Sequence, residues 1–249
     1  MDGAERLARR VAALRGCSRA EAERLILAGR VRVDGVVQDQ PPTRVTPAQA
    51  ISVDEGAPLQ AIGPVTLLWH LPAGTALPAS TFLPDAQADA WLAPPACAGG
   101  GIGGFGPTPV RAHRHRQQPL LRLAPGESGL QVFTQVPAVA RRLDDARVPL
   151  EAEWFVDLSG EPVDRAAVLA SMAAPLAFDG RPLLPARASW ASDRRLRVVV
   201  RGAVPGQVSH LVARAGLAVA AVHRQRLGRI GLGPLAPGQW RYVAANERF

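Results

Sequence analysis

The chain of 249 residues is long enough to bury a sizeable core, and its length favours a large domain joined to a smaller one. The formal net charge of +8 is carried by arginine, since the sequence contains no lysine. A basic surface favours nucleic acid or an anionic membrane as a partner, although the bias toward alanine, glycine and proline accounts for part of the charge. The two cysteines, Cys17 and Cys97, have no CxxC pattern and no matching histidines, which excludes a disulfide framework and a zinc site.

The N-terminus is charged from its second residue and lacks the apolar core of a signal peptide. No uninterrupted apolar run reaches the length of a membrane span. The sequence therefore predicts a cytoplasmic protein with no membrane partner, and we expect a monomer.

Two short helices are predicted near the N-terminus. Residues 4–15 have apolar side chains at helical spacing and arginines around the remaining surface. Ser18 followed by Glu21 is a capping box, and Gly29 stands where a helix often ends in glycine. A second helix is therefore expected from about residue 18 to residue 28.

Strands follow these helices. Residues 30–33 alternate arginine with valine, Asp34-Gly35 is a hairpin turn signal, and residues 49–56 predict a closing strand. The segment GCSRAEAERLILAGRVRVDGVV resembles the S4-type, or alpha-L, RNA-binding domain, and the similarity spans residues 4–58. The resemblance implies contacts with an RNA phosphate backbone from Arg15, Arg19, Arg24, Arg30 and Arg32. The alternative is a solvated basic face, because Asp2, Glu5, Glu21 and Glu23 dilute the charge.

The next part predicts an apolar strand over residues 64–74 and a flexible Pro/Gly-rich loop over residues 75–118. The loop contains GGGIGGFG, which lacks the flanking pattern of a phosphate-binding motif. His113 and His115 lie among arginines that would repel a metal cation, so no metal site is expected. We expect a mobile basic segment there that contacts RNA or nothing.

From residue 120 on, helices and strands are mixed. LLRLAPGESGLQVFT, residues 120–134, predicts two apolar strands around a Pro-Gly turn. After this loop we expect a helix near 137–147, a strand over 151–160 and a helix over 166–178. A strand over 194–206 follows, and then a helix and a strand over 208–222. Residues 223–247 are expected to form a closing strand and a turn region. This pattern indicates an α+β domain rather than a doubly wound sheet.

The order of these segments resembles the RsuA/RluB/RluE/RluF family of rRNA pseudouridine synthases over nearly the whole chain. Two motifs support this resemblance. The first is Ser128-Gly129-Leu130 followed by Phe133-Thr134. The second is Gly-Arg-Ile-Gly-Leu-Gly, residues 228–233, followed by Leu235, Gly238, Trp240 and Arg241. The resemblance implies an S4-type domain over 1–58 and a mixed, mostly antiparallel pseudouridine-synthase-like domain over 62–249. It also implies an enzyme without metal or organic cofactor, which flips a uridine from RNA and breaks its bond to ribose with the help of an Asp carboxylate.

In that family the reacting Asp follows Arg-Leu in the loop at 120–134, whereas here Arg122-Leu123 precedes Ala124. A methyl group can neither attack a sugar carbon nor take a proton. The family's basic stretch appears as AVPGQVSH, residues 203–210, without the arginine that would pair with the carboxylate. Joint loss of both charges is physically consistent, because a lone buried cation would be costly.

Two other acidic residues deserve comparison with the missing Asp. Glu127 lies in the same loop, but the turn changes direction between it and Ala124, so we expect a loop charge. Asp144 follows Arg142-Leu143 and is expected to be a surface charge on a helix. Trp154 is either a stacking partner for an extruded base or a core aromatic. Arg122 contacts phosphate or anchors the loop through a carboxylate such as Glu127.

Three functions remain open from the sequence. The first is a catalytically impaired member of this family that binds structured RNA, with rRNA as the expected partner. Its basic flank would be the ten arginines from Arg194 onward, which have only Glu247 as an acid among them. The second is an active rRNA pseudouridine synthase that uses a displaced carboxylate such as Glu127. The third is an interaction module in ribosome assembly.

Overall fold

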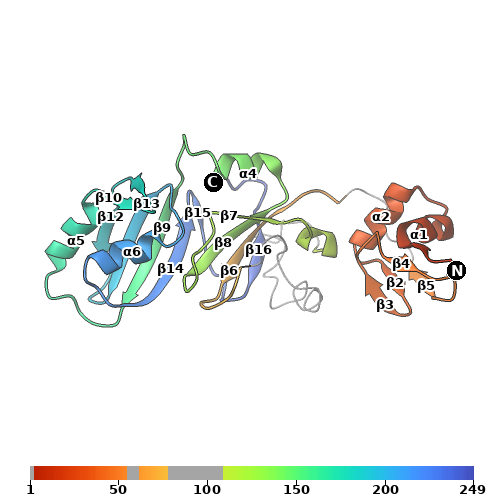
Figure 1. Cartoon of the computed structure of the whole chain (residues 1–249), viewed down its shortest axis with the longest axis horizontal. Helices are drawn as coiled ribbons and strands as arrows, with labels where there is room; N and C mark the ends of the chain where they lie inside the picture. Colours follow the sequence, from red (N-terminus) through yellow and green to blue (C-terminus); the bar gives the residue numbers. More distant parts are fainter. Residues whose placement is uncertain (1–2, 55–61, 78–108) are drawn as a thin grey trace.

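The computed structural model of the chain describes residues 3–54, 62–77 and 109–249. The described residues form two separate hydrophobic cores, one within residues 7–53 and one within residues 65–249. Figure 1 shows the two cores at opposite ends of an elongated molecule, with the N-terminal unit on the right. The expected loop motif GGGIGGFG lies outside the described residues.

The N-terminal unit packs two helices against short strands. Its elements are β1 (Glu5–Arg6), α1 (Leu7–Arg15), α2 (Arg19–Leu27), β2 (Val31–Val33), β3 (Val36–Gln38), β4 (Arg44–Val45) and β5 (Ile51–Val53). Helix α2 begins as predicted, because the Ser18 side chain accepts from the Glu21 backbone N–H and the Glu21 side chain accepts from the Ser18 N–H. Gly29 follows the helix in the left-handed conformation, with φ +71°.

A mixed sheet forms the larger unit. Its strands are β6 (Thr66–Leu71), β7 (Gln118–Leu120), β8 (Ser128–Thr134), β9 (Glu151–Leu158), β12 (Arg187–Trp190), β13 (Arg195–Arg201), β14 (Val219–Leu227), β15 (Ile230–Gly231) and β16 (Trp240–Tyr242). The main order is β12-β13-β9-β14-β8-β6-β16, and of these pairs only β14 with β8 is parallel. The α+β architecture with mostly antiparallel strands is therefore confirmed.

Helices and a hairpin surround this sheet. They are the 3-10 helix η2 (Arg111–Arg114), α4 (Pro137–Leu143), α5 (Arg165–Ala173), α6 (Gln207–Arg214), and the hairpin of β10 (Leu176–Phe178) and β11 (Arg181–Leu183). The helix expected over 166–178 ends early, at Ala173. Ala174 precedes Pro175 and is extended, with ψ 148°, because proline disfavours a helical residue before it. The residues after it form β10 instead.

A buried ionic cluster joins the two units. Asp39 of the N-terminal unit is 6% exposed and accepts a hydrogen bond of 2.8 Å from Arg114 on η2, which is fully buried. Arg111 and His115 lie 3.6 and 3.3 Å from the same carboxylate. Burial alone would raise the pKa of Asp39, but hydrogen bonds from His115 and Arg114 outweigh it and hold this pKa well below its usual range.

This cluster corrects the prediction of a mobile basic segment at the end of the 75–118 loop. Residues 111–114 form a helix, His113 is 3% exposed, and its Nδ1 lies 2.6 Å from the Tyr242 hydroxyl. The residues 78–108 of the expected loop lie outside the described part. The sequence does not reveal this cluster, because the acidic partner of these arginines, Asp39, is distant in the sequence.

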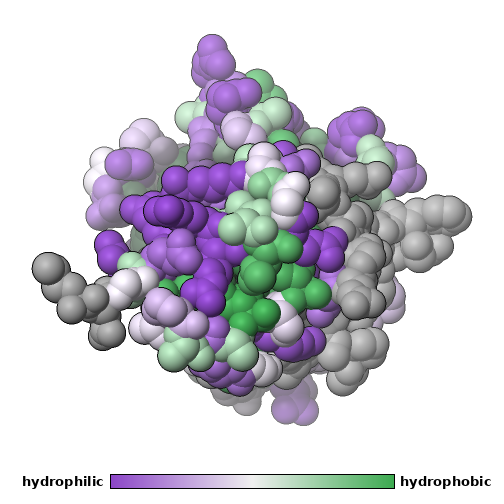
Figure 2. All heavy atoms as spheres, turned by 90° about the vertical axis from the view of Figure 1, so that its right-hand side faces the viewer, coloured by the Kyte–Doolittle hydropathy of each residue, from purple (hydrophilic) through white to green (hydrophobic). Residues whose placement is uncertain are grey.

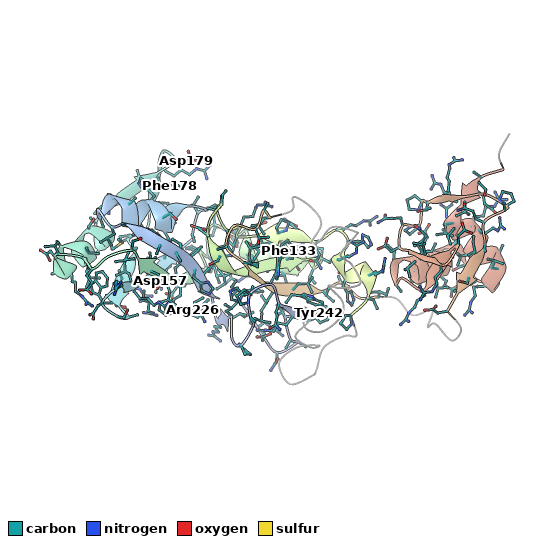
Figure 3. All side chains as sticks on the ribbon, turned by 90° about the horizontal axis from the view of Figure 1, so that it is seen from below. Phe133, Asp157, Phe178, Asp179, Arg226 and Tyr242 are labelled. Atoms are coloured by element: carbon teal, nitrogen blue, oxygen red, sulfur yellow. The ribbon has the colours of Figure 1, made fainter. Side chains whose placement is uncertain are left out.

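Four of the ten C-terminal arginines, Arg195, Arg197, Arg201 and Arg226, pair with carboxylates of β9, which weakens the prediction of a strongly positive flank. Arg195 lies 2.6 Å from Asp157, and Arg197 lies 2.7 Å from Glu153. Arg226 contacts Glu153 at 2.9 Å, and Figure 3 labels it in the same part of the molecule as Asp157. Counting acids only within the C-terminal segment missed the carboxylates that β9 supplies.

No helix among the described residues is long and apolar enough to cross a bilayer.

Candidate nucleic-acid interface and reaction loop

The loop between β7 and β8 is fixed by backbone and side-chain hydrogen bonds. The Glu127 N–H donates to the Ala124 carbonyl at 3.0 Å, which closes the turn. Gln131 on β8 accepts from the Leu123 N–H at 3.1 Å and donates to the Leu120 carbonyl at 2.8 Å. Gln131 is fully buried, so it ties both ends of the loop to the sheet from inside.

Glu127 folds back toward Ala124 instead of projecting as a loop charge, which corrects the expectation from turn geometry. Only 3% of the surface of Glu127 is exposed. Oε2 accepts from the Ala124 N–H at 2.8 Å, and Oε1 accepts from the Ser209 hydroxyl on α6 at 3.4 Å. Both oxygens of this carboxylate therefore have partners within the protein.

The side chain of Ala124 faces the start of α6. A Cβ built on Gly206, which precedes α6 and has φ +82°, would lie 3.9 Å from the Ala124 Cβ and 3.6 Å from the Phe178 ring. The Phe178 ring packs on His210, with ring centroids 5.0 Å apart. The β10–β11 hairpin thus supplies an aromatic side chain next to Gly206 and His210. Sequence reasoning missed it because residues 166–178 were assigned to a helix.

Arg224 on β14 lies beneath the loop and is 1% exposed. Its guanidinium donates to the Leu130 carbonyl at 2.7 Å and to the Leu121 carbonyl at 2.6 Å. Burial lowers the pKa of Arg224 to about 9, and the nearby Glu127 opposes that change. Sequence analysis gave Arg224 no role, since only the strand pairing of β14 with β8 brings it to the loop.

The expected site residues Trp154 and Arg122 have structural contacts. Trp154 is 2% exposed, and the Arg224 guanidinium carbon lies 5.2 Å from its ring centroid. One face of this ring is therefore covered by a cation rather than open to a base. Arg122 donates to the Leu77 carbonyl at 3.2 Å, so this side chain contacts the backbone of the protein. Asp144 is exposed at the end of α4, as expected.

A serine and two histidines meet at the start of β8. The Ser128 hydroxyl donates to the Val222 carbonyl at 3.2 Å and lies 3.1 Å from His223 Nδ1. The ring of His70 packs edge-on against the ring of His223, with the two ring centroids 5.1 Å apart. Burial, followed by the neighbouring His70, lowers the pKa of His223. Since the Ser128 hydroxyl is directed to a backbone carbonyl, this cluster orders the strand ends.

Groups of three or more His, Cys, Asp or Glu able to hold a metal ion do not occur in the described residues.

The five arginines predicted to bind RNA all lie on the N-terminal unit. Arg15, Arg19 and Arg30 are exposed, while Arg24 and Arg32 are partly buried. Arg19 pairs with Glu23 at 3.2 Å, and Arg30 pairs with Asp54 at 3.5 Å. These are surface pairs, which cost little to open when a phosphate approaches. Figure 2 views the molecule from this end and shows a mostly hydrophilic surface around a smaller hydrophobic area.

Comparisons with known proteins agree with this geometry. Residues 5–51 match the S4 domain. The chain is 27% identical over 233 residues to the ribosomal small subunit pseudouridine synthase A of Yersinia pestis, covering 93% of this chain and 92% of that protein. It is 26% identical over 243 residues to the Salmonella typhimurium protein of the same name, covering 97% of each. A crystal structure of a pseudouridylate synthase shares the fold, with TM-score 0.53, 18% identity and 96% of each chain covered. These similarities, which extend over nearly the whole chain, support the resemblance to the RsuA/RluB/RluE/RluF family of rRNA pseudouridine synthases.

Proposed function

We propose that this protein binds small-subunit ribosomal RNA and does not convert uridine to pseudouridine. The S4 match and the arginines of the N-terminal unit support RNA binding. The names of the two relatives support ribosomal RNA of the small subunit as the partner. A monomeric state and a cytoplasmic location belong to the same proposal.

The observation that carries the loss of catalysis is Ala124. The family resemblance assigns this position to the Asp that reacts with the sugar, and a methyl side chain supplies no nucleophile and no base. Arg224 lies below the loop. Because position 124 holds alanine and offers no carboxylate, the Arg224 guanidinium donates to the Leu130 and Leu121 carbonyls instead. The framework of the loop is thus present without its reacting group.

A second candidate function is an active synthase that uses Glu127, because its carboxylate lies 2.8 Å from the Ala124 N–H in the same loop. Two observations weigh against it. Both carboxylate oxygens are occupied by donors of the protein, and the residue is only 3% exposed. A reacting carboxylate must instead approach the sugar of the extruded nucleotide within contact distance.

The test compares RNA binding and uridine conversion in the same samples. Wild-type protein, Glu127→Gln and the double variant Arg15→Gln/Arg32→Gln are incubated with an unmodified small-subunit rRNA transcript. We expect wild type and Glu127→Gln to bind with a steep salt dependence, and the double arginine variant to bind with a shallower one. We expect no pseudouridine in any sample.

Each other outcome selects a different function. Conversion by wild type that Glu127→Gln abolishes would establish the displaced-carboxylate enzyme. RNA affinity that is absent or insensitive to salt would contradict RNA binding and favour an interaction module in ribosome assembly. Thermal unfolding of each variant serves as the control that the chain remains folded.

A further inference from the structure

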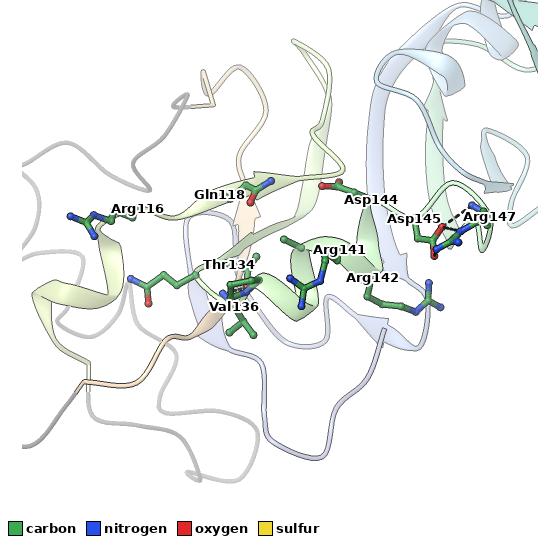
Figure 4. A pocket seen from close by; sticks show the side chains of 12 residues that line it. Arg116, Gln118, Thr134, Val136, Arg141, Arg142, Asp144, Asp145 and Arg147 are labelled. Carbon is green, nitrogen blue, oxygen red and sulfur yellow. Dashed lines mark hydrogen bonds and ion pairs between the residues drawn. The ribbon is translucent and has the colours of Figure 1, made fainter.

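A basic groove runs along the molecule from the N-terminal unit to α4, away from Ala124. One part, of about 890 Å³, lies between that unit and the segment after η2, and a second part, of about 850 Å³, lies beside α4. Arg116 and Gln118 line both parts, so the two parts are adjacent. We call this surface the α4 groove, and Figure 4 shows its second part.

Positive charge dominates the lining. The groove is lined by the arginines Arg6, Arg19, Arg116, Arg141, Arg142 and Arg147, and by the carboxylates Glu23, Asp144 and Asp145. Two of the carboxylates are already paired, since Glu23 contacts Arg19 and Asp145 contacts Arg147.

Three of these arginines remain available to a ligand. Arg6, Arg116 and Arg141 are exposed and form no ion pair with any residue of the described ranges. Asp144 at the end of α4 is the single lining carboxylate in the described part that has no ion pair. The groove therefore has an excess of free positive charge spread along its length, which attracts a polyanion.

The backbone at Arg116 points to a functional surface. Its φ of +54° lies in the left-handed region, where glycine is favoured and which this chain occupies mostly with glycine. A non-glycine residue there keeps a conformational cost, and such residues concentrate at binding sites. In Figure 4 the Arg116 side chain extends outward from the backbone rather than toward Asp144.

The two walls of the first part are held in a fixed relation. The buried contact of Asp39 with Arg114 connects the N-terminal unit to η2, two residues before Arg116. Buried ion pairs of this kind specify geometry more than they stabilise it. The buried contact thus links the two walls of the first part of the groove.

The lining indicates which part of a nucleic acid would be bound. Phe, Tyr and Trp are absent from the lining within the described residues, and the one histidine there, His115, lies 3.3 Å from the Asp39 carboxylate, so the groove offers no open stacking platform for bases. The exposed Gln118 accompanies the arginines, and its side-chain amide is a donor that suits phosphate oxygens. We propose that the α4 groove binds the phosphate backbone of RNA, as a second contact that extends the S4 surface along the molecule; this inference rests on the RNA binding proposed above.

The experiment measures the salt dependence of affinity for a short mixed-sequence RNA stem-loop. We compare wild type, the groove variant Arg116→Gln/Arg141→Gln, and the matched control Arg181→Gln/Arg229→Gln, whose arginines are exposed elsewhere. Each phosphate contact contributes about one unit to the slope of log affinity against log salt. We expect the groove variant to lose about two units of slope relative to wild type. The control should keep the wild-type slope, and all three proteins should unfold at the same temperature.

A groove variant with the wild-type slope and affinity would overturn the inference while leaving RNA binding by the S4 domain intact. An equal loss in groove and control variants would also overturn it, because the effect would then follow net charge and not location. If wild type itself binds RNA without salt dependence, the proposed function fails and the inference fails with it. If an acidic protein and not RNA binds this surface, the groove variant should bind RNA with the wild-type slope and affinity.

Discussion

Gly129, at the start of β8, is the residue at which the backbone beside the β7–β8 loop is most constrained. It has φ +102°, and a Cβ at this position would lie 2.3 Å from the carbonyl oxygen of Arg224. The contact is with backbone, so no side-chain rotation can relieve it. This close approach explains why the parallel pairing of β8 with β14 begins at a Ser-Gly sequence.

We predict that Gly129→Ala destabilises the protein by about 2–5 kcal/mol, from backbone strain combined with overpacking. The measurement is the free energy of unfolding from urea titration. Gly160→Ala is the matched control, because a Cβ there meets nothing within 4 Å. Equal stability of the two variants would contradict the close approach.

Glu127 and Ser209 are the other residues that define the loop. Replacing the buried carboxylate leaves the Ala124 N–H without its acceptor. We predict that Glu127→Ala lowers the free energy of unfolding by about 1–3 kcal/mol, the cost of an unsatisfied buried polar group. Glu161→Ala, at an exposed glutamate, is the control and should change stability little. A Glu127→Ala protein as stable as wild type would show that these hydrogen bonds do not hold the loop.

At the scale of elements, η2 couples stability to pH through His113. Burial lowers the pKa of His113 to about 4, compared with about 6.5 in an unfolded chain. The unfolded state therefore binds more protons between these values, so stability is fully present above about pH 6.5 and is lost as pH falls toward 4. His223, whose pKa burial also lowers, adds to the same trend.

We predict a stability decrease of about 1–2 kcal/mol between pH 6.5 and 5, measured as the urea midpoint at each pH. The variant His113→Gln should show a smaller decrease over this interval, because it removes the larger of the two titrations. The Glu153 carboxylate does not interfere, since its pKa is lowered to about 2 by its hydrogen bond from Arg197. An identical pH profile in wild type and His113→Gln would refute the assignment.

Elements differ in how far sequence predicts them. The capping box at Ser18, the alternation of arginine with valine in β2 and the turn at Asp34-Gly35 are local signals, and the corresponding elements form where expected. The boundary after α5 was missed because a single proline outweighed an otherwise helical composition. Local signals thus predicted elements and the fold class, and failed where one residue decided a boundary.

Long-range pairs account for the parts of the site that sequence could not predict. Asp39 and Arg114 are 75 positions apart, and Arg197 and Glu153 are 44 apart. Only the strand register and the docking of η2 bring these charges together, so the basic flank was overestimated and the buried cluster was missed. The family motif located the loop and Ala124, whereas the inward fold of Glu127 required its partner Ser209 on α6.

At the scale of the whole molecule, Asp39 fixes the N-terminal unit against the larger one. We predict that Asp39→Asn loosens this joint, because the buried arginine loses its anionic partner, and that small-angle X-ray scattering then shows a larger or more variable radius of gyration. Asp54→Asn is the control, since Asp54 pairs with Arg30 on the surface of the same unit. Indistinguishable scattering of Asp39→Asn and wild type would mean that other contacts hold the units together.

The central claim concerns chemistry at Ala124, and nucleoside mass spectrometry tests it most directly. Wild-type protein is incubated with unmodified small-subunit rRNA transcript at a concentration that saturates binding, and the pseudouridine content of the RNA is then measured. We predict the same pseudouridine content as in transcript incubated without protein. Pseudouridine formed in proportion to enzyme and time would contradict the account.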